Sequence, residues 1–442
     1  MYLERKVYSN LKDWKKSDEN SLYVIGAPGV GKSYVVDVFA KNEYATNIVV
    51  DFSGLDNSMT DFLSNNISNP SGVCEYLSVK YNTPLYKDNS LIVFDNIQDN
   101  PISTEVINSI ANTKKYDVIG IGIRGDISEE NNRLHIYPLS FDEFCIAIGE
   151  RELLNTILKC FNNKQKMDDE KHEKAMTLYK QYIIVGGMPQ SILSYIQNER
   201  NIIFSNAQNE DLLKNYNNGI DEIDKKNKWK IKELYNSIPK FLSKNEKRIF
   251  VSDIEKKTSY AKSENVIGWL SNSNYVNESV QYAPVREDDG VGDRRKYFKL
   301  YLSDTGLLVK HASNAFSANN DNILESILRD DYSSNEGMLL ENSIAQNLCS
   351  NGHKLKYYTH YNETSHHNDI SIDFVVHERT KDGKEQICPI EIKTGSHYST
   401  KSMEKFIEKY KTSIRQAYII HTKNLEFKKD IMCIPPYMIT CI

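Results

Sequence analysis

Residues 21–33 read Ser-Leu-Tyr-Val-Ile-Gly-Ala-Pro-Gly-Val-Gly-Lys-Ser, an apolar run that leads directly into a glycine-rich loop. The loop matches the pattern Gly-x-x-x-x-Gly-Lys-Ser/Thr, in which inward-pointing backbone N–H groups surround a phosphate. A helix-compatible stretch, residues 33–40, follows the loop, so that the N-terminus of a helix would face the phosphate. The loop residues that shape this turn are Gly26, Pro28, Gly29 and Gly31.

The two residues that end the loop carry its chemistry. We expect Lys32 to reach the outer phosphates of a nucleotide and Ser33 to ligate Mg²⁺. The apolar run before the loop predicts a buried strand, which is the context that this motif requires. The stretch therefore predicts a site for ATP and magnesium.

Composition limits the classes of protein that remain. A chain of 442 residues is long for one hydrophobic core, so two or three domains are expected. The formal net charge of -5 indicates no overall basic field for nucleic acid. Seven cysteines without a Cys-x-x-Cys pair argue against a zinc site or a disulfide framework. Without an apolar signal core or a membrane-length apolar run, we expect a soluble, cytoplasmic protein with no membrane partner.

Four further apolar runs, at residues 47–53, 90–95, 117–123 and 134–140, alternate with helix-compatible spans. With the first strand they predict a five-stranded parallel α/β sheet. The run 90–95 ends in Asp95, which we expect beside the magnesium of a P-loop ATPase.

Two segments then resemble a known signature. Pro138-Leu-Ser-Phe-Asp-Glu-Phe144, followed by Tyr182-Ile-Ile-Val-Gly-Gly-Met-Pro189, resembles that of prokaryotic AAA-type ATPases with a restriction-endonuclease-like C-terminal domain. The resemblance implies an AAA-type nucleotide-binding core over residues 1–150, a helical lid over 151–225, a winged-helix-like domain over 226–310 and a restriction-endonuclease-like domain over 311–442.

The chain departs from this family at two positions. The family usually has Asp-Glu-Ile-Gln where this chain has Asp95-Asn-Ile-Gln98, and Thr-Gly-Ser where it has Ile121-Gly-Ile123. An amide at Asn96 cannot accept a proton as a carboxylate does, so the departures concern hydrolysis and not nucleotide binding. Gln98 or Asp99 are candidates to replace the missing glutamate.

Residues 227–282 predict three helices, and residues 275–282 and 297–302 predict two strands of a wing. Arg294-Arg-Lys296 in the wing loop could contact phosphates, but the acidic Glu287-Asp-Asp289 shares that loop. A DNA-binding module and a structural connector both remain open.

The C-terminal part holds a second candidate site. A predicted helix over 338–348 carries Glu341, a strand over 370–376 carries Asp373 in its middle, and a strand over 386–393 carries Glu391 and Lys393. Asp373 and Glu391 would hold one or two hard cations, Glu341 would complete the metal shell, and Lys393 would position a water for attack on a phosphodiester. An ordinary ladder of opposite charges on a sheet is the alternative interpretation.

The leading hypothesis is an ATP-binding protein that couples Mg-ATP to binding or cleavage of DNA or RNA by the C-terminal domain. The alternative is a nucleotide-dependent switch or scaffold that binds ATP but barely hydrolyses it. A third possibility is an interaction protein in which both sites are relics. An oligomer is compatible with the family resemblance, but the sequence does not assign one.

Overall fold

The computed structural model describes residues 2–123, 132–223, 227–250, 260–283, 297–316, 323–329, 334–362, 367–379, 385–395 and 397–442. The chain forms two compact units. The N-terminal unit comprises residues 2–137 with 272–274, and the C-terminal unit comprises residues 138–271 with 275–442. The finer division into four domains stays a prediction.

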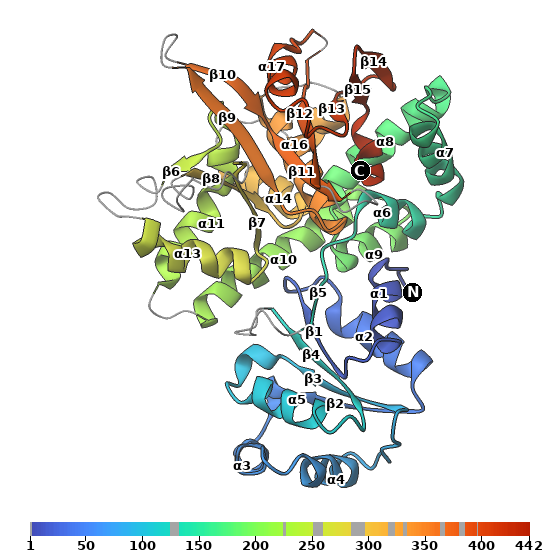
Figure 1. Cartoon of the computed structure of the whole chain (residues 1–442), viewed down its shortest axis with the longest axis vertical. Helices are drawn as coiled ribbons and strands as arrows, with labels where there is room; N and C mark the ends of the chain where they lie inside the picture. Colours follow the sequence, from blue (N-terminus) through green and yellow to red (C-terminus); the bar gives the residue numbers. More distant parts are fainter. Residues whose placement is uncertain are drawn as a thin grey trace. The chain divides into compact units, whose positions relative to one another are not determined.

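The N-terminal unit is built on one parallel sheet in the order β2-β3-β4-β1-β5 (Figure 1). This result confirms the predicted α/β class with a parallel five-stranded sheet. Since β4 lies between β1 and β3, the carboxyl ends of those three strands meet at one edge, where ligands bind in such sheets. The strands are β1 (Ser21–Ile25), β2 (Thr46–Asp51), β3 (Ser90–Asp95), β4 (Asp117–Gly122) and β5 (Arg133–His135).

Apolar side chains on both faces explain why these runs form a parallel sheet. Ile92 and Phe94 of β3 join the core cluster on one face, whereas the alternate residues Leu91 and Val93 are also buried. Helices therefore cover the sheet on both faces. They are α1 (Val7–Lys15), α2 (Lys32–Glu43), α3 (Asn57–Asn65), α4 (Pro70–Lys80) and α5 (Ser103–Ala111), with short 3-10 turns η1 (Phe52–Gly54) and η2 (Ile97–Asp99).

The last predicted strand of this sheet is shorter than the sequence suggests. The prediction covered residues 134–140, but β5 ends at His135. Pro138 has no N–H to donate to a ladder, and Ser140 already caps the next helix in a capping box with Glu143.

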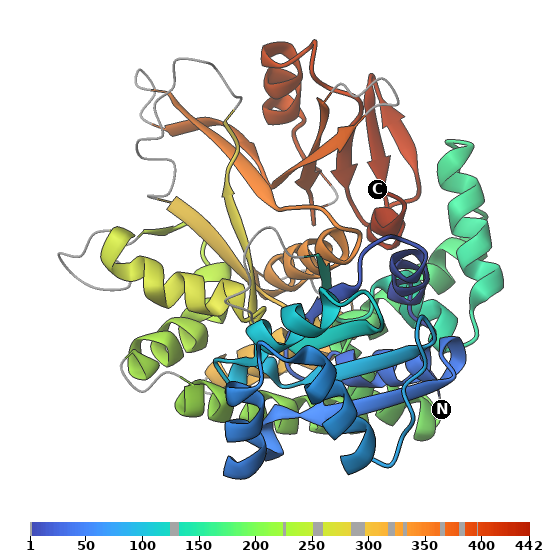
Figure 2. The same cartoon turned by 60° about the horizontal axis from the view of Figure 1, so that its bottom comes forward.

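The C-terminal unit combines a helical layer with two mixed sheets (Figures 1 and 2). Its helices are α6 (Phe141–Ala147), α7 (Arg151–Asn162), α8 (Asp169–Val185), α9 (Pro189–Gln197), α10 (Ile202–Ile223), α11 (Lys228–Leu242), α13 (Tyr260–Asn272), α14 (Thr305–Phe316), α15 (Ile323–Arg329), α16 (Ser334–Ser350), α17 (Lys401–Lys409) and the 3-10 helix η4 (Pro436–Cys441).

One sheet has the order β10-β9-β7-β8-β6 and the other β11-β12-β13-β15-β14. The first contains β6 (Ile249–Phe250), β7 (Val276–Gln281), β8 (Tyr297–Leu302), β9 (Lys356–Asn362) and β10 (His367–Ile372), and the second β11 (Phe374–Arg379), β12 (Glu385–Ile392), β13 (Ala417–Ile420), β14 (Glu426–Lys428) and β15 (Ile431–Ile434).

The two predicted wing strands form an antiparallel pair, β7 with β8, and β7 also pairs in parallel with β9. The ribbon is thus continuous with strands from the C-terminal part of the chain. The predicted helix near residues 251–257 and the charged segments 287–289 and 294–296 lie outside the described residues.

The predicted strand over residues 370–376 is in fact two strands. Asp373 lies between β10 and β11, which belong to different sheets. Its carboxylate, at Oδ2, accepts the N–H of Ile392 at 2.8 Å. Asp373 therefore stands at the point where the chain crosses from one sheet to the other.

Two turns of the C-terminal unit meet around the buried carboxylate of Asp304. Gly187 donates its N–H to Oδ2 at 2.6 Å, and Leu307 donates to Oδ1 at 3.0 Å. The side-chain amide of Gln346 on α16 donates to Oδ2 at 3.3 Å. Gly186 leaves α8 with φ of 79°, and a Cβ there would lie 2.3 Å from Asp304 Oδ1. The backbone of Gly186 and the carboxylate of Asp304 thus pack too closely for a residue with a Cβ atom at position 186.

Within the described residues, no helix is both long and apolar enough to cross a membrane.

Replacing Gly186 by alanine should lower the free energy of unfolding by about 2–4 kcal/mol, because left-handed strain adds to the overlap with Asp304. Gly149→Ala is the matched control, since Gly149 has φ of 81° but no atom within 4 Å of its Cβ position. It should cost only about 1–2 kcal/mol of strain. Urea unfolding of the full chain measures both, and equal losses would contradict the proposed close contact.

Candidate functional site

The glycine-rich loop connects β1 to the N-terminus of α2, as the sequence predicts. Gly26 follows β1 and donates its N–H to Gly122 of β4 at 3.3 Å. Pro28 and Gly29 lie in the turn, and Gly31, with φ of 87°, directly precedes α2. Residues 26–31 therefore present their backbone at the carboxyl edge of the sheet.

Lys32 is buried at the centre of this loop. Its Nζ donates to the carbonyls of Gly26 and Ala27, each at 2.9 Å. Burial lowers the pKa of Lys32 to about 8, and the charge of Asp95 partly opposes this shift. The next residue, Ser33, is exposed at the first turn of α2. A hydroxyl and a carboxylate, Ser33 and Asp95, are the hard oxygen ligands that suit Mg²⁺.

The residue that replaces the expected glutamate contacts a second carboxylate. Asn96 has a left-handed backbone with φ of 55°, and its N–H donates to Asp95 Oδ1 at 2.8 Å. Its side-chain amide donates to Oδ1 of Asp51 at 2.8 Å. Asp51 ends β2 and lies in register with Asp95, which ends β3. Burial would raise the pKa of Asp51, but the hydrogen bonds from Asn96 and Ser53 hold it below its ordinary value.

The other two candidates for the missing carboxylate are engaged elsewhere. Gln98 Oε1 accepts the N–H of Ile123 at 3.2 Å, which ties η2 to the residue after β4. The Gln98 amide nitrogen donates to Asp99 at 3.3 Å. Asp99 itself is an exposed residue at the end of η2.

Arg5 supports the loop from outside, and the sequence did not single it out. Its guanidinium donates to the carbonyl of Val30 at 2.9 Å and to that of Tyr137 at 2.7 Å. A buried arginine in an otherwise charged N-terminal segment carries no local signal of this role.

The second candidate site lies in the C-terminal unit and begins with Glu341 on α16, a fully buried carboxylate. Lys299 Nζ lies 3.2 Å from its Oε1, the Tyr301 hydroxyl donates to the same oxygen at 2.5 Å, and Lys247 pairs with Oε2. Burial would raise the pKa of Glu341, but Lys299 and Lys247 outweigh burial and lower it to about 2. These partners, Lys247, Lys299 and Tyr301, come from the segment 247–301, and the sequence singled out none of the three.

Asp373 lies beside this cluster, with Oδ1 3.9 Å from Lys299 Nζ. Burial and the charge of Glu341 raise the pKa of Asp373. Lys299 therefore faces two carboxylates, Glu341 with a lowered pKa and Asp373 with a raised pKa.

Glu391, near the end of β12, pairs with Lys393 through Oε1, as their spacing predicts. The other oxygen, Oε2, is buried and has no hydrogen-bond partner among the described residues. Burial raises the pKa of Glu391 to about 7 against the opposing charge of Lys393. An orphaned carboxylate oxygen beside Asp373 is a fitting ligand for a hard divalent cation.

The structure places Glu341 and Asp373 around Lys299, and Glu391 beside Lys393. Glu341 already has two lysines and a tyrosine as partners, so Asp373 and Glu391 are the carboxylates that could most readily hold a cation. Among the described residues, only His421, Glu426 and Cys433 bring three possible ligand atoms within 4.8 Å of one another. His421 Nδ1 accepts the N–H of Lys423 at 3.3 Å, so a metal there would have to compete with that bond.

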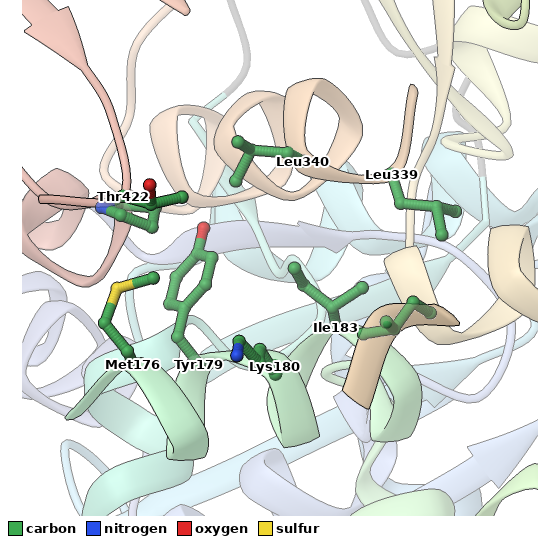
Figure 3. A pocket seen from close by; sticks show the side chains of 9 residues that line it. Met176, Tyr179, Lys180, Ile183, Leu339, Leu340 and Thr422 are labelled. Atoms are coloured by element: carbon green, nitrogen blue, oxygen red, sulfur yellow. The ribbon is translucent and has the colours of Figure 1, made fainter. Parts of the chain in front are cut away.

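A small cavity of about 40 Å³ lies between α8 and α16 (Figure 3). Its wall is largely apolar, and Met176, Tyr179 and Ile183 of α8 face Leu339 and Leu340 of α16 across it. With few polar groups it suits neither nucleotide nor metal.

Comparison with known families yields two partial matches. Residues 176–319 match a family model described as a domain of unknown function, DUF8612, and residues 336–439 match a second domain of unknown function, DUF4143. No curated protein matches the chain.

Three solved structures share parts of the arrangement at low sequence identity. A Walker-type ATPase of Pyrococcus abyssi, PABY2304, is 11% identical with a TM-score of 0.41, covering 70% of this chain and 96% of its own. PH0952 of Pyrococcus horikoshii, a signal transduction ATPase with a tetratricopeptide repeat sensor, is 13% identical with a TM-score of 0.28 and coverage of 79% and 45%. A DNA replication initiation factor is 12% identical with a TM-score of 0.23 and coverage of 60% and 86%.

Lys299→Met should destabilise the C-terminal unit by about 3–5 kcal/mol, because Glu341 would be left buried with one cation fewer. Lys405→Met is the control, since the pair of Lys405 with Asp369 is half-exposed and worth less than about 1 kcal/mol. In the wild type, the lowered pKa of Glu341 stabilises the fold at pH values above 4.5, which is the pKa of this group in the unfolded chain. This contribution is lost as the pH falls toward about 2. Urea unfolding at several pH values should show a weaker acid dependence in Lys299→Met; an unchanged profile would contradict the assignment.

Proposed function

We propose that the protein binds Mg-ATP at the glycine-rich loop and hydrolyses it slowly. The observation that carries this proposal is Lys32, whose buried ammonium is surrounded by loop carbonyls at the start of α2 and lies in the field of Asp95. A buried cation without an ionised partner in hydrogen-bond contact is well placed to receive an anion. The polyphosphate of a nucleotide supplies that anion and would replace the carbonyls as the partner of Nζ.

Ser33 and Asp95 would hold the magnesium that accompanies ATP. That ion neutralises charge on the phosphates during transfer. The loop N–H groups and the positive end of α2 would orient the same phosphates. Hydrolysis is expected to be slow because position 96 offers an amide where a proton acceptor is useful.

Lys32→Ala should abolish ATP binding, whereas Lys41→Ala, an exposed lysine on the same helix paired with Asp37 at 2.7 Å, should bind as wild type does. Since Lys32 has a pKa of about 8, wild-type affinity should fall about tenfold between about pH 7 and pH 9 as the ammonium deprotonates. Calorimetric titration measures both effects. A wild-type affinity that is independent of pH would contradict the lowered pKa of Lys32, and unchanged binding by Lys32→Ala would refute the site.

ATP turnover on the same samples, with and without DNA, distinguishes an ATPase coupled to nucleic acid from a nucleotide-dependent switch or scaffold. Turnover that DNA raises supports an ATPase coupled to nucleic acid. ATP binding without turnover supports the nucleotide-dependent switch or scaffold.

A second function, action on a phosphodiester of DNA or RNA, is favoured by the orphaned Oε2 of Glu391. Together the buried Glu391 and the partly buried Asp373 supply two carboxylate groups that a divalent cation would satisfy. Such a cation neutralises charge on a phosphodiester and acidifies a bound water. Lys393, in contact with Glu391, would orient that water in a restriction-endonuclease-like arrangement. In this proposal Glu341 positions Lys247 and Lys299 and does not bind the metal itself.

Purified protein with Mg²⁺ or Mn²⁺ should cleave at least one form of single-stranded or double-stranded DNA or RNA. Glu391→Gln and Lys393→Ala should each lower the rate at least about a hundredfold. Glu404→Gln, at an exposed carboxylate paired with Lys429, should leave the rate unchanged. Because Glu391 must ionise to bind a cation and has a pKa of about 7, cleavage should rise between about pH 6 and pH 8. Intact substrates under all conditions would eliminate cleavage as the role of this domain.

A further inference from the structure

We propose that Asp51, at the end of β2, orients and deprotonates the water that attacks the terminal phosphate. This inference rests on the ATP hydrolysis proposed above and names the residue that would perform it. Nothing in the local sequence around Asp51 identifies such a role, since β2 carries no motif.

The need for such a residue follows from position 96. A water that attacks a phosphate must lose a proton, and a carboxylate or imidazole is the usual acceptor. Asn96 offers only an amide. Gln98 is also an amide and is bound to Ile123, and Asp99 is turned toward Gln98. Asp95 is reserved for magnesium in the proposed site.

The position of Asp51 follows from the sheet. β2 and β3 are parallel neighbours, and Asp51 is the register partner of Asp95. Adjacent strands lie about 4.8 Å apart, so the two residues stand side by side at the edge where the glycine-rich loop also lies. Asn96 reaches from β3 to Asp51 through a hydrogen bond of 2.8 Å. The Asp51 carboxylate is thus one hydrogen bond beyond the side chain at position 96.

The two oxygens of Asp51 differ in their surroundings. Oδ1 accepts three hydrogen bonds, from Asn96 and from the N–H and hydroxyl of Ser53, at 2.8, 2.9 and 2.8 Å. In the described part of the chain, Oδ2 accepts none, and the residue is exposed to solvent. Oδ1 therefore fixes the orientation of the carboxylate, while Oδ2 remains available for a water molecule.

Asn96 then has a positioning role. Its left-handed backbone lets one residue contact Asp95 through its N–H and Asp51 through its side chain. An amide can donate to Asp51, whereas a carboxylate at position 96 would repel it. Asn96, after β3, thus orients the carboxylate of Asp51, and Asp51, at the end of β2, accepts the proton. A single carboxylate at position 96 would otherwise perform this task alone.

The reaction step balances with water and a nucleoside triphosphate. The water oxygen forms a bond to the terminal phosphorus as the bond from that phosphorus to the bridging oxygen breaks. One water proton passes to Oδ2 of Asp51 and then to solvent. The products are the nucleoside diphosphate, which keeps the bridging oxygen, and inorganic phosphate.

Asp51→Asn tests the proposal, because asparagine still caps η1 and accepts from Ser53 but cannot take a proton. Its kcat for ATP should fall about 10² to 10⁴-fold, with the Kd for ATP within about threefold of wild type. Asp56→Asn is the matched control, since Asp56 is also an exposed N-cap, accepting from Met59 N–H at 2.7 Å, and lies in the same unit. Its kcat should be unchanged.

An exchange variant gives a second readout. Asp51→Asn combined with Asn96→Asp reverses the carboxylate and the amide across the same hydrogen bond, so turnover should recover at least about tenfold over Asp51→Asn.

The inference requires both the loss of turnover in Asp51→Asn and its recovery in the exchange variant. The inference is overturned if Asp51→Asn keeps wild-type kcat, if it weakens ATP binding as much as it slows turnover, or if the exchange does not recover turnover. Wild type that binds ATP without turnover also overturns it but leaves the proposed binding function intact, whereas wild type that binds no ATP refutes the proposed function itself.

Discussion

The C-terminal unit depends on one buried carboxylate, Asp304. It collects N–H groups from two turns and an amide from α16, and its burial raises its pKa to about 6. The turns concerned are those after α8 and before α14, which lie far apart in the chain. The Gly-Gly of the segment 182–189 therefore has a packing role, because only glycine permits the approach of Gly186 to Asp304 and of Gly187 to the backbone of Leu139.

The same helix α16 connects this contact to the second candidate site. Gln346 bonds to Asp304, and Glu341, on the same helix, bonds to Lys299 and Tyr301 of β8. Since Glu341, Asn342 and Gln346 of α16 are buried, each must find a partner, and the partners of Glu341 and Asn342 on β8 align that strand against the helix. The geometry around Asp373 is thus a consequence of how the interior of the unit satisfies its polar groups.

Both candidate sites contain a buried charge whose partners are only partly supplied by the chain. Lys32 has carbonyls in place of an anion, and Glu391 has one oxygen paired and one without a partner. An incompletely satisfied buried group costs stability, so its presence is more often explained by a ligand than by folding. Asp51 differs, since it is exposed and its free oxygen costs little. Its significance comes from its orientation by Asn96.

The sequence by itself determined the parallel sheet, the position of the glycine-rich loop and the place of Asp95 at the end of a buried strand. It could do so because apolar runs and the Gly-Lys-Ser spacing are local properties of the chain. It also identified the Glu391 and Lys393 pair, since residues two apart on a strand share a face. Only the tertiary structure decided that Lys247 and Lys299 neutralise Glu341, that Asp373 separates two strands, and that Asn96 bonds to Asp51. Each of these features joins residues that are distant in the chain or belong to different sheets. The preference of a charged group for a partner creates these contacts, and such pairing produces no periodic pattern in the sequence.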